Sequence, residues 1–566
     1  MSYCDKLSRF AAVAAALALA TTRAFAAWGP DGATIKSTTA SIPLVTACSD
    51  GSDGTFVAWQ ELTGSGVGVL LVQHVLASAD VDPSWPSAGA TACGTAAARA
   101  DLGLAPDHLG GAYLWWREGA ALLTNHISSS GQVAGGWSGC GETVGSVRAY
   151  TPASAIEDGA HGLYIGWADL RPGGAPAVAM LIHFAPDGTN LADVYVAPPS
   201  AVGDVYYVEL ALGPDGGVFA EWSTSSSDTT LAPNDHRIRR MNPDGSNVPG
   251  WPQKGISLGP FSSCAPAVSP DGRGGVFALL FPSTGTSPQL QRLTAQGQRA
   301  ADWPPVVSIP ASVLFGGVCL DSRGGALRVA PDGQDGAFAG YGDFQYTDSP
   351  PYYEMTRVLA SGTIDGSSST EGLLVAQPET VVKGDGGAFL ATISPDGPYQ
   401  PADPDAFLSL RQSRPGPGWT DFYEYHPQIA WAWYGDIGLA PASDGGCVFF
   451  WSQVTERFGL FARRFSGTGE VTAVEPGRSP APSLRIRALR FAPGNGVWAS
   501  LDLPDATARL ELYDAAGRRM AASDLSRAGA AADVLIPGTA WLPSGMYFVR
   551  LSAGARTVAG RVVVLK

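Results

Sequence analysis

Short apolar runs separated by glycine-rich turns recur along most of this 566-residue chain. One copy reads GPDGGVFAEWS at 213–223, where Asp215 and Gly216 suit a tight turn and the residues that follow are mostly apolar. Neighbouring side chains of a strand point to opposite faces, and this strand carries Phe219 on one face and Trp222 on the other. A sheet with one face in water alternates more strictly, so we expect these strands to be covered on both faces.

Eight copies of this hairpin align on the glycine before the second strand: Gly54, Gly111, Gly162, Gly217, Gly275, Gly336, Gly387 and Gly446. The intervals between these glycines are 51 to 61 residues, and seven of the eight copies carry Phe or Tyr two positions after the glycine. Five copies carry Trp five positions after it: Trp59, Trp116, Trp167, Trp222 and Trp451. An aspartate stands shortly before each glycine: Asp50, Asp107, Asp158, Asp215, Asp271, Asp332, Asp385 and Asp444.

Each repeat continues with a third strand, such as VLLVQHV at 69–75, and several add a fourth segment that opens with Trp, such as WPQKGISL at 251–258. Four strands per repeat are typical of a propeller blade. The sequence therefore predicts an all-β chain with an eight-bladed β-propeller. The last copy lacks its fourth strand and a spare strand opens the first copy at 28–39, so we expect the N-terminal strand to complete the last blade. An open stack of sheets and two smaller propellers are the alternatives.

Residues 1–26 resemble a secretory signal, with Lys6 and Arg9 before an apolar run and Ala24-Phe25-Ala26 at the end. We expect a secreted or extracellular protein, and attachment to the outer cell surface is the alternative to release. After signal removal we expect no transmembrane segment. Six further cysteines permit disulfides or buried thiols. The net charge of −15 argues against nucleic acid as a partner.

The composition changes near residue 477, after which eleven Arg and one Lys stand against six acidic residues. We expect a propeller at 27–476 and a second domain at 477–566 that forms a small β-sandwich. Its segments LELYDAAGRRM (510–520) and LPSGMYFVRLSAG (542–554) resemble the Ig-like C-terminal domains of the FlgD type and the type A sorting domains of the type IX secretion system. The resemblance implies recognition by an outer-membrane export machine. The matching residues are Tyr513, Gly517, Arg518, Gly545, Tyr547 and Lys566.

The repeat region resembles, more weakly, the DG-x-GG arrays of secreted bacterial β-propeller-like proteins, a group without one shared activity. No nucleophile elbow, zinc-protease motif or phosphate-binding loop occurs in the sequence. We expect no cofactor, although the turn aspartates offer the oxygen ligands that calcium uses. Several third strands carry a basic side chain that we expect on a solvated strand face: His74, His126, His183, Arg239, Arg292 and Arg463.

Two segments depart from the repeat, at 342–355 and 416–435, and both are rich in aromatic residues. Exposed aromatic side chains on a rigid scaffold suit the binding of sugars or peptides. The candidate binding residues are Tyr352, Tyr353, Trp419, Tyr423, Tyr425 and His426. The sequence thus favours a non-enzymatic binding or adhesion scaffold for an extracellular glycan or protein. The alternative is a polysaccharide-directed hydrolase or lyase whose site lies at the propeller axis, with carboxylates from different blades.

Overall fold

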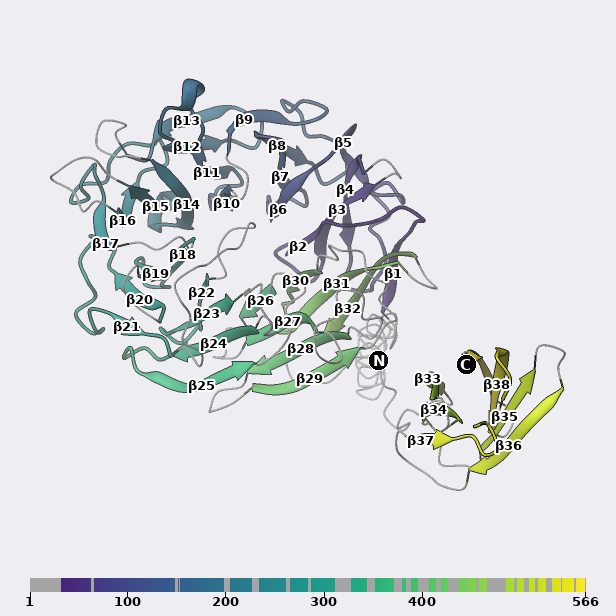
Figure 1. The fold of residues 1–566 in the computed structure, drawn as a ribbon. Helices are drawn as coiled ribbons and strands as arrows, with labels where there is room; N and C mark the ends of the chain where they lie inside the picture. Colours follow the sequence, from purple (N-terminus) through teal and green to yellow (C-terminus); the bar gives the residue numbers. More distant parts are fainter. Residues whose placement is uncertain are drawn as a thin grey trace, which may run out of the picture. The chain divides into compact units, whose positions relative to one another are not determined.

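A computed structural model shows an eight-bladed β-propeller followed by a small Ig-like β-sandwich (Figure 1). The contacts divide the chain into two compact units, Met1–Ala473 and Val474–Lys566. The structure describes residues 32–62, 66–147, 151, 153–197, 204–225, 234–260, 265–282, 287–310, 327–343, 352–370, 379–382, 388–394, 407–413, 419–425, 437–443, 445–454, 458–465, 485–492, 496–502, 508–514, 518–525, 532–540, 542–553 and 556–564. No helix among these residues is long and apolar enough to cross a membrane.

Each blade is a four-stranded antiparallel sheet. Blades one to three consist of β2 (Val45–Ser49), β3 (Thr55–Leu62), β4 (Gly68–Val75) and β5 (Ala90–Ala97); β6 (Ala100–Pro106), β7 (Ala112–Glu118), β8 (Ala121–Ile127) and β9 (Glu142–Ser146); and β10 (Ser154–Glu157), β11 (Leu163–Asp169), β12 (Val178–Phe184) and β13 (Asn190–Tyr195). Blades four to six consist of β14 (Val205–Leu212), β15 (Val218–Ser225), β16 (Asn234–Met241) and β17 (Ile256–Gly259); β18 (Ala267–Pro270), β19 (Val276–Leu280), β20 (Gln289–Leu293) and β21 (Val307–Ser308); and β22 (Leu327–Pro331), β23 (Ala337–Asp343), β24 (Tyr352–Val358) and β25 (Ile364–Thr370).

Blade seven consists of β26 (Glu379–Val382), β27 (Ala388–Ser394), β28 (Phe407–Ser413) and β29 (Trp419–Tyr425). Blade eight takes three strands from the last repeat, β30 (Ile437–Pro441), β31 (Cys447–Val454) and β32 (Phe458–Phe465), and its outer strand is β1 (Ala33–Ser37). Strand β1 pairs antiparallel with β32, which confirms the expected closure of the ring by the N-terminal strand. Two short 3₁₀ turns, Pro172–Gly174 and Pro214–Gly216, lie in blades three and four.

The first strand of each blade lies nearest the ring axis (Figure 1). Strands β2, β6, β10, β14, β18 and β22 contact one another in that order, and β30 contacts both β26 and β2. The hydrophobic core lies between blades: one cluster joins blades one and two, the next joins two and three, and others continue around the ring. This arrangement explains why the hairpin strands are apolar on both faces.

The recurrent tryptophans belong to these interfaces between blades. The tryptophans that stand five positions after the repeat glycine are almost fully buried: Trp59, Trp116, Trp167, Trp222 and Trp451. Those that precede a fourth strand are buried as well: Trp85, Trp137, Trp251 and Trp303. Truncating a buried Trp to Ala typically costs about 3–5 kcal/mol, so each ring is a large contribution to blade packing. The prediction that these residues serve the fold is confirmed.

The second unit is a sandwich of two sheets. The first sheet is formed by β33 (Arg485–Ala492), β34 (Gly496–Asp502) and β37 (Ala532–Leu535). The second sheet has the order β36 (Arg519–Leu525), β35 (Ala508–Asp514), β38 (Gly545–Ala553) and β39 (Arg556–Val564). Alternate residues of the second sheet form the core between the sheets: Leu510, Leu512, Val549, Leu551, Val562 and Val564.

Candidate functional site

A buried carboxylate at the hairpin turn recurs in five blades, four positions before the repeat glycine: Asp50, Asp107, Asp158, Asp271 and Asp332. In blade three, Oδ1 of Asp158 accepts the backbone N–H groups of Ala160 at 2.6 Å and Gly162 at 2.8 Å. A Cβ atom on Gly162 would lie 2.4 Å from Oδ2 of Asp158, which explains the repeated glycine. The aspartate therefore shapes the turn from within.

The second oxygen of each of these carboxylates accepts a hydrogen bond from a basic side chain on the third strand. The donors are His74, His126, His183, Arg292 and Arg357, at 2.7–3.0 Å. The three histidines are 3–8 % exposed. The expectation of a solvated strand face is wrong, because the histidine Nε2 atom points at the turn carboxylate behind it. Both oxygens of each of these carboxylates are thus bonded within the protein.

The strand register also corrects which arginines are equivalent to the histidines. His183 lies opposite Tyr164, and the residues in that register position of blades four and eight are Arg240 and Arg464. The predicted Arg239 and Arg463 are one residue away and therefore on the opposite face of the strand. Sequence alignment alone missed this one-residue shift.

Aromatic rings pack on the basic residue in several of these clusters, and in blade two they join the cluster to blade three. Tyr113 stacks on His126 with ring centroids 4.1 Å apart. The Tyr113 hydroxyl donates to the carbonyl of His161 in blade three, and Nδ1 of His126 lies 3.1 Å from the carbonyl oxygen of Pro186 in that blade. Trp137 Nε1 donates to the same Pro186 oxygen at 3.0 Å. These polar groups act as clamps between blades.

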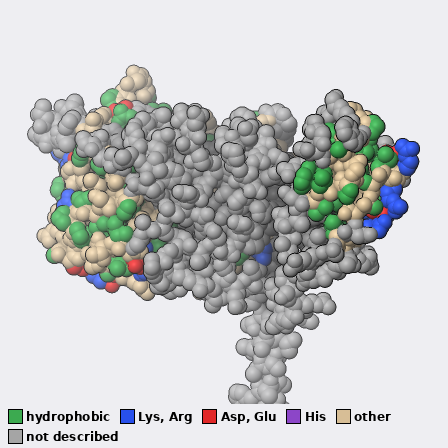
Figure 2. Space-filling model, turned by 60° about the horizontal axis from the view of Figure 1, so that its bottom comes forward, with side chains coloured by type: hydrophobic (Ala, Val, Ile, Leu, Met, Phe, Trp, Pro, Cys, Tyr) green, Lys and Arg blue, Asp and Glu red, His purple; other side chains and the backbone are tan. Residues whose placement is uncertain are grey.

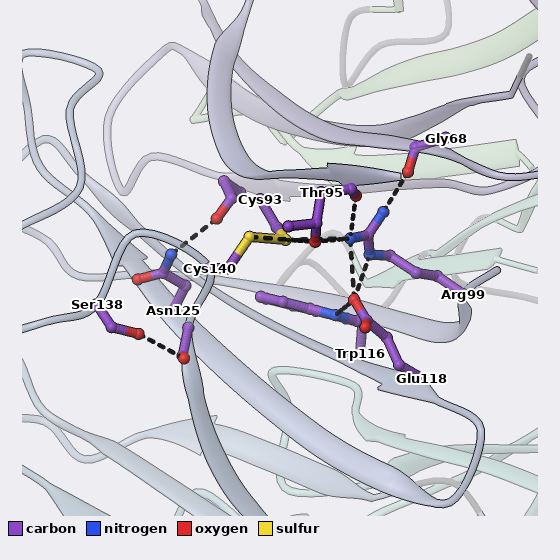
Figure 3. Close-up of a disulfide and its surroundings, with 11 residues drawn as sticks. Gly68, Cys93, Thr95, Arg99, Trp116, Glu118, Asn125, Ser138 and Cys140 are labelled. Carbon is purple, nitrogen blue, oxygen red and sulfur yellow. Dashed lines mark hydrogen bonds and ion pairs between the residues drawn. A yellow bond between two sulfur atoms is a disulfide. The ribbon is translucent and has the colours of Figure 1, made fainter. Parts of the chain in front are cut away.

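A disulfide adds a covalent link between blades one and two (Figure 3). It joins Cys93 on β5 to Cys140, just before β9. Arg99 donates to the Sγ atom of Cys93 at 3.1 Å and to the carbonyl of Thr95 at 2.8 Å, and it forms an ion pair with Glu118 of blade two at 2.9 Å. The outer strands of these two blades are therefore held both covalently and by charge.

Blade four lacks the buried turn carboxylate. Gly213 takes the position of the aspartate, and the Asp215 side chain is 94 % exposed. Arg240, which replaces the histidine, donates to the carbonyls of Pro214 at 3.1 Å and Ala295 at 3.3 Å. Backbone oxygens thus take over the role that the carboxylate has in blade three.

Instead, blade four carries buried acidic and basic groups closer to the axis. Glu209 on β14 lies directly opposite Glu221 on β15. Oε1 of Glu221 lies 2.8 Å from Nδ1 of His236 on β16, and both side chains are fully buried. Oε2 of Glu221 and the hydroxyl of Ser223 are buried without a hydrogen-bond partner among the described residues. The line Glu209–Glu221–His236 therefore runs across three strands of one blade face.

Burial sets the protonation of this line. It raises the pKa of Glu221 well above its ordinary value and lowers the pKa of His236 to about 3. His236 is therefore neutral at pH 7, and burial favours the protonated form of Glu221, whose carboxyl can donate to the imidazole. Burial also raises the pKa of Glu209 to about 7, opposed by Ser154 and by the charge of Arg328. A carboxyl that titrates near neutral pH can both give and accept a proton.

Glu209 belongs to one level of residues around the axis, defined by register with the second strands: Thr46, Gly103, Ser154, Glu209, Ala267, Arg328, Glu379 and Gly438. The charges at this level come from blades four, six and seven. The residues equivalent to Glu221 in the other blades are uncharged: Ala58, Trp115, Gly166, Leu279, Gly340, Ala391 and Phe450. Glu221 thus breaks the repeat, and this signal was present in the sequence.

The predicted binding aromatics lie on two neighbouring blades. Tyr352 and Tyr353 are on β24, the third strand of blade six, and the others described are on β29, the fourth strand of blade seven: Trp419, Tyr423 and Tyr425. His426 lies outside the described residues. The prediction that these residues bind a ligand stays a prediction.

The sorting-domain residues lie in the second unit. Tyr547 is buried and its hydroxyl donates to the carbonyl of Pro543 at 3.0 Å. Tyr513 donates to Glu511 and Arg518 forms an ion pair with Asp514, both at 3.0 Å. Gly545 begins β38, whereas Gly517 and Lys566 lie outside the described residues. Within the described part of the chain, no group of three or more His, Cys, Asp or Glu residues is placed to hold a metal ion.

No family model matches the chain, and no curated protein matches it. Among solved structures, the BP39L lectin from Burkholderia pseudomallei is similar with a TM-score of 0.44 and 13 % identity, covering 70 % of this chain and all of the lectin. The Dos1 propeller is similar with a TM-score of 0.39 and 9 % identity over 76 % of this chain and 94 % of its own. PorZ, a surface component of the type IX secretion system of Porphyromonas gingivalis, has a TM-score of 0.28 and 10 % identity over 93 % of this chain and 82 % of its own.

Proposed function

We propose that this chain is a secreted or cell-surface protein whose propeller is a non-enzymatic scaffold for binding or adhesion. The observation that carries the proposal is the use of the repeated polar residues as clamps between blades, with both oxygens of the turn carboxylates bonded inside the protein. Rigid scaffolds of this kind present recognition residues on their loops and strand ends. The Cys93–Cys140 disulfide supports export, because disulfides persist in oxidising compartments.

The ligand in this proposal is an extracellular glycan or protein, bound at the aromatic segments of blades six and seven. Aromatic side chains contribute contact area at low entropic cost, which suits both kinds of ligand. Strands β24 and β29 bring Tyr353 and Trp419 into adjacent blades of one rigid ring.

Binding can be tested on the chain without residues 1–26, against panels of immobilised polysaccharides and extracellular proteins. For a ligand found in this way, Tyr353→Ala and Trp419→Ala should each weaken binding about tenfold or more, and Tyr195→Ala should not. Tyr195 is a matched control because it is exposed and ends the outer strand of blade three. Equal affinity of all four proteins would contradict the binding site.

The second unit is proposed to direct export, through recognition by outer-membrane machinery. The arrangement of Tyr513, Gly517, Arg518, Gly545, Tyr547 and Lys566 supports this role by its resemblance to sorting domains. Removing residues 477–566 should leave the propeller in the periplasm of the producing cell, as followed by fractionation. Unchanged delivery of the truncated chain to the surface or medium would refute the sorting role and leave the binding role standing.

A catalytic role at the axis is a second candidate, favoured by Glu209. Its carboxyl has a pKa near 7, lies opposite Glu221, and shares a level of the ring with Arg328. This set can hold or move a proton beside an anionic sugar. If the chain cleaves an acidic polysaccharide, Glu209→Gln should abolish product formation while Asp215→Asn, on the surface of the same blade, should not. Absence of cleavage by the unmodified chain across neutral and acidic polysaccharides would remove this candidate.

A further inference from the structure

The face of sheet β36-β35-β38-β39 that points away from the sandwich core carries charged side chains. Strand β35 buries Leu510 and Leu512, so Glu511 and Tyr513 point to the opposite face. Across the ladder, Arg550 lies opposite Glu511. The side of the sheet that faces away from the sandwich core is therefore polar in its middle.

Three arginines from three strands converge on the carboxylate of Glu511. Arg550 donates through Nε to Oε2 at 3.0 Å, Arg519 donates to Oε1 at 3.1 Å, and Arg509 lies 3.4 Å from Oε1. The Tyr513 hydroxyl also donates to Oε2 at 3.0 Å. The Arg550 hydrogen bond, together with these other donors, lowers the pKa of Glu511 to about 2. One carboxylate thus holds three guanidinium groups on this face.

The arginine side chains remain accessible although they are anchored. Their exposed fractions are 45 % for Arg509, 55 % for Arg519 and 49 % for Arg550. A guanidinium group has five N–H donors, so the contacts of Arg519 and Arg550 with Glu511 leave donors for a second acceptor. Arg550 also lies over the Tyr513 ring at 5.1 Å, which holds the guanidinium plane. Preorganised arginine forks of this kind bind carboxylates in a bidentate manner.

Apolar side chains adjoin this charge on the same strand. Met546 and Phe548 are four and two positions before Arg550 on β38, hence on the same face, and are 45 % and 43 % exposed. Figure 2 shows hydrophobic side chains and clustered Lys and Arg side chains exposed on this unit. Met546 and Phe548 gain most from contact with apolar side chains, so a partner with apolar groups beside its anionic ones fits this face best.

We propose that this face, formed by Arg509, Arg519, Arg550, Phe548 and Met546, is a docking surface for an acidic polypeptide that carries apolar side chains next to its carboxylates. Charge complementarity supports the choice, because residues 478–566 have an excess of six positive charges. Glu511 already shows that the three guanidinium groups are placed to hold a carboxylate. The surface does not depend on the binding role proposed for the propeller.

The test uses the full chain without residues 1–26 and a fluorescent peptide of alternating Glu and Leu. The double variant Arg509→Glu/Arg519→Glu should bind the peptide about tenfold or more weakly, and Phe548→Ser should also weaken it. Arg171→Glu is the control, because Arg171 is an exposed arginine of the propeller. The thermal unfolding of each variant shows whether it is folded. A peptide of alternating Lys and Leu should not bind.

Two results would overturn the proposal. One is equal affinity of the Glu-Leu peptide for the unmodified chain and the double variant. The other is binding through these residues to alginate or to vesicles of phosphatidylglycerol but not to the peptide, which would make the face a general polyanion surface. Neither result would affect the glycan or protein binding proposed for blades six and seven.

Discussion

Blades three and four are neighbours with the same strand order, yet they place their charged residues differently. Blade three holds Asp158 and His183 together at the hairpin turn and has Gly166 close to the axis. Blade four has Gly213 at the turn and a buried Glu221 in the position of Gly166. Blade three uses its turn carboxylate and imidazole to join neighbouring blades, whereas blade four holds two carboxyl groups with raised pKa values and an imidazole within its own sheet. The comparison separates residues that repeat for stability from residues that break the repeat.

The difference matters because burying an ionisable group without a counter-ion is costly. Asp158 and His183 compensate each other, so their cluster stabilises the ring. Glu221 and His236 share one hydrogen bond, while a buried oxygen of Glu221 lacks a partner among the described residues. Groups kept at such cost are often functional. For this reason the axis end of blade four, rather than the turn carboxylates, supports the second candidate function.

The largest expected effect is the loss of the turn carboxylate in blade three. Asp158→Ala leaves His183 and two backbone N–H groups buried without their acceptor, and should lower the free energy of unfolding by about 3–5 kcal/mol. Asp215→Ala, the exposed aspartate of blade four, should change it by less than about 0.5 kcal/mol. Denaturant unfolding measures both. Similar losses would show that the two turns are equivalent after all.

The pH dependence of stability should have opposite signs in the two blades. Burial raises the pKa of Asp158, but the hydrogen bonds from His183 and from the backbone of Ala160 and Gly162 together lower it more. The stabilisation by Asp158 is therefore present above pH 3.8 and is lost as the pH falls through the folded pKa. The pKa of Glu209 is raised to about 7, so its effect on stability worsens as the pH rises from 4.5 to about 7.

Accordingly, Glu209→Gln should become more stable than the unmodified chain as the pH rises through this window, by up to about 1.4 kcal/mol per pH unit. Asp158→Asn should be less stable than the unmodified chain above pH 3.8, and its stability should fall less steeply as the pH drops below 3.8. Thermal unfolding from pH 3 to pH 8 measures the slopes. A Glu209→Gln profile parallel to that of the unmodified chain would contradict a raised pKa in the folded state.

The smallest expected effect comes from restoring the carboxylate in blade four. Gly213→Asp places a carboxylate where Asp158 stands in blade three, within the reach of Arg240, and should raise the free energy of unfolding by about 1 kcal/mol. A double-mutant cycle with Arg240→Gln tests whether the gain depends on that arginine. A gain that persists in the Arg240→Gln background would mean that the turn, not the ion pair, is stabilised.

The repeat made the fold predictable from sequence. A glycine before each second strand, an aromatic residue two positions later and Trp at the fifth position gave eight blades, because blade packing places the same demand on each copy. The spare strand at the N-terminus predicted the closure by β1 for the same reason. Periodic constraints of this kind are local in sequence and therefore visible in it.

The side-chain partners were less predictable, since they depend on register. The turn aspartates looked equivalent, but the buried ones stand four positions before the glycine. Asp215 stands two positions before it and is 94 % exposed, although its carboxylate lies 3.6 Å from Arg240. Arg239 and Arg240 differ by one residue and lie on opposite faces. The Glu209–Glu221–His236 line joins three strands, so no spacing within one strand reveals it. The one part of this line that the sequence could have indicated is Glu221, because the equivalent position of every other repeat holds an uncharged residue.

The pairing of β1 with β32 joins segments separated by more than four hundred residues of chain. Such a distant pairing is slow to form and has to wait until the last repeat has been synthesised. If the export proposed above carries the chain across a membrane unfolded, the ring therefore stays open until the last repeat has emerged. Proteolysis that removes β1 (Ala33–Ser37) would therefore leave β32 without its outer partner and open the last blade.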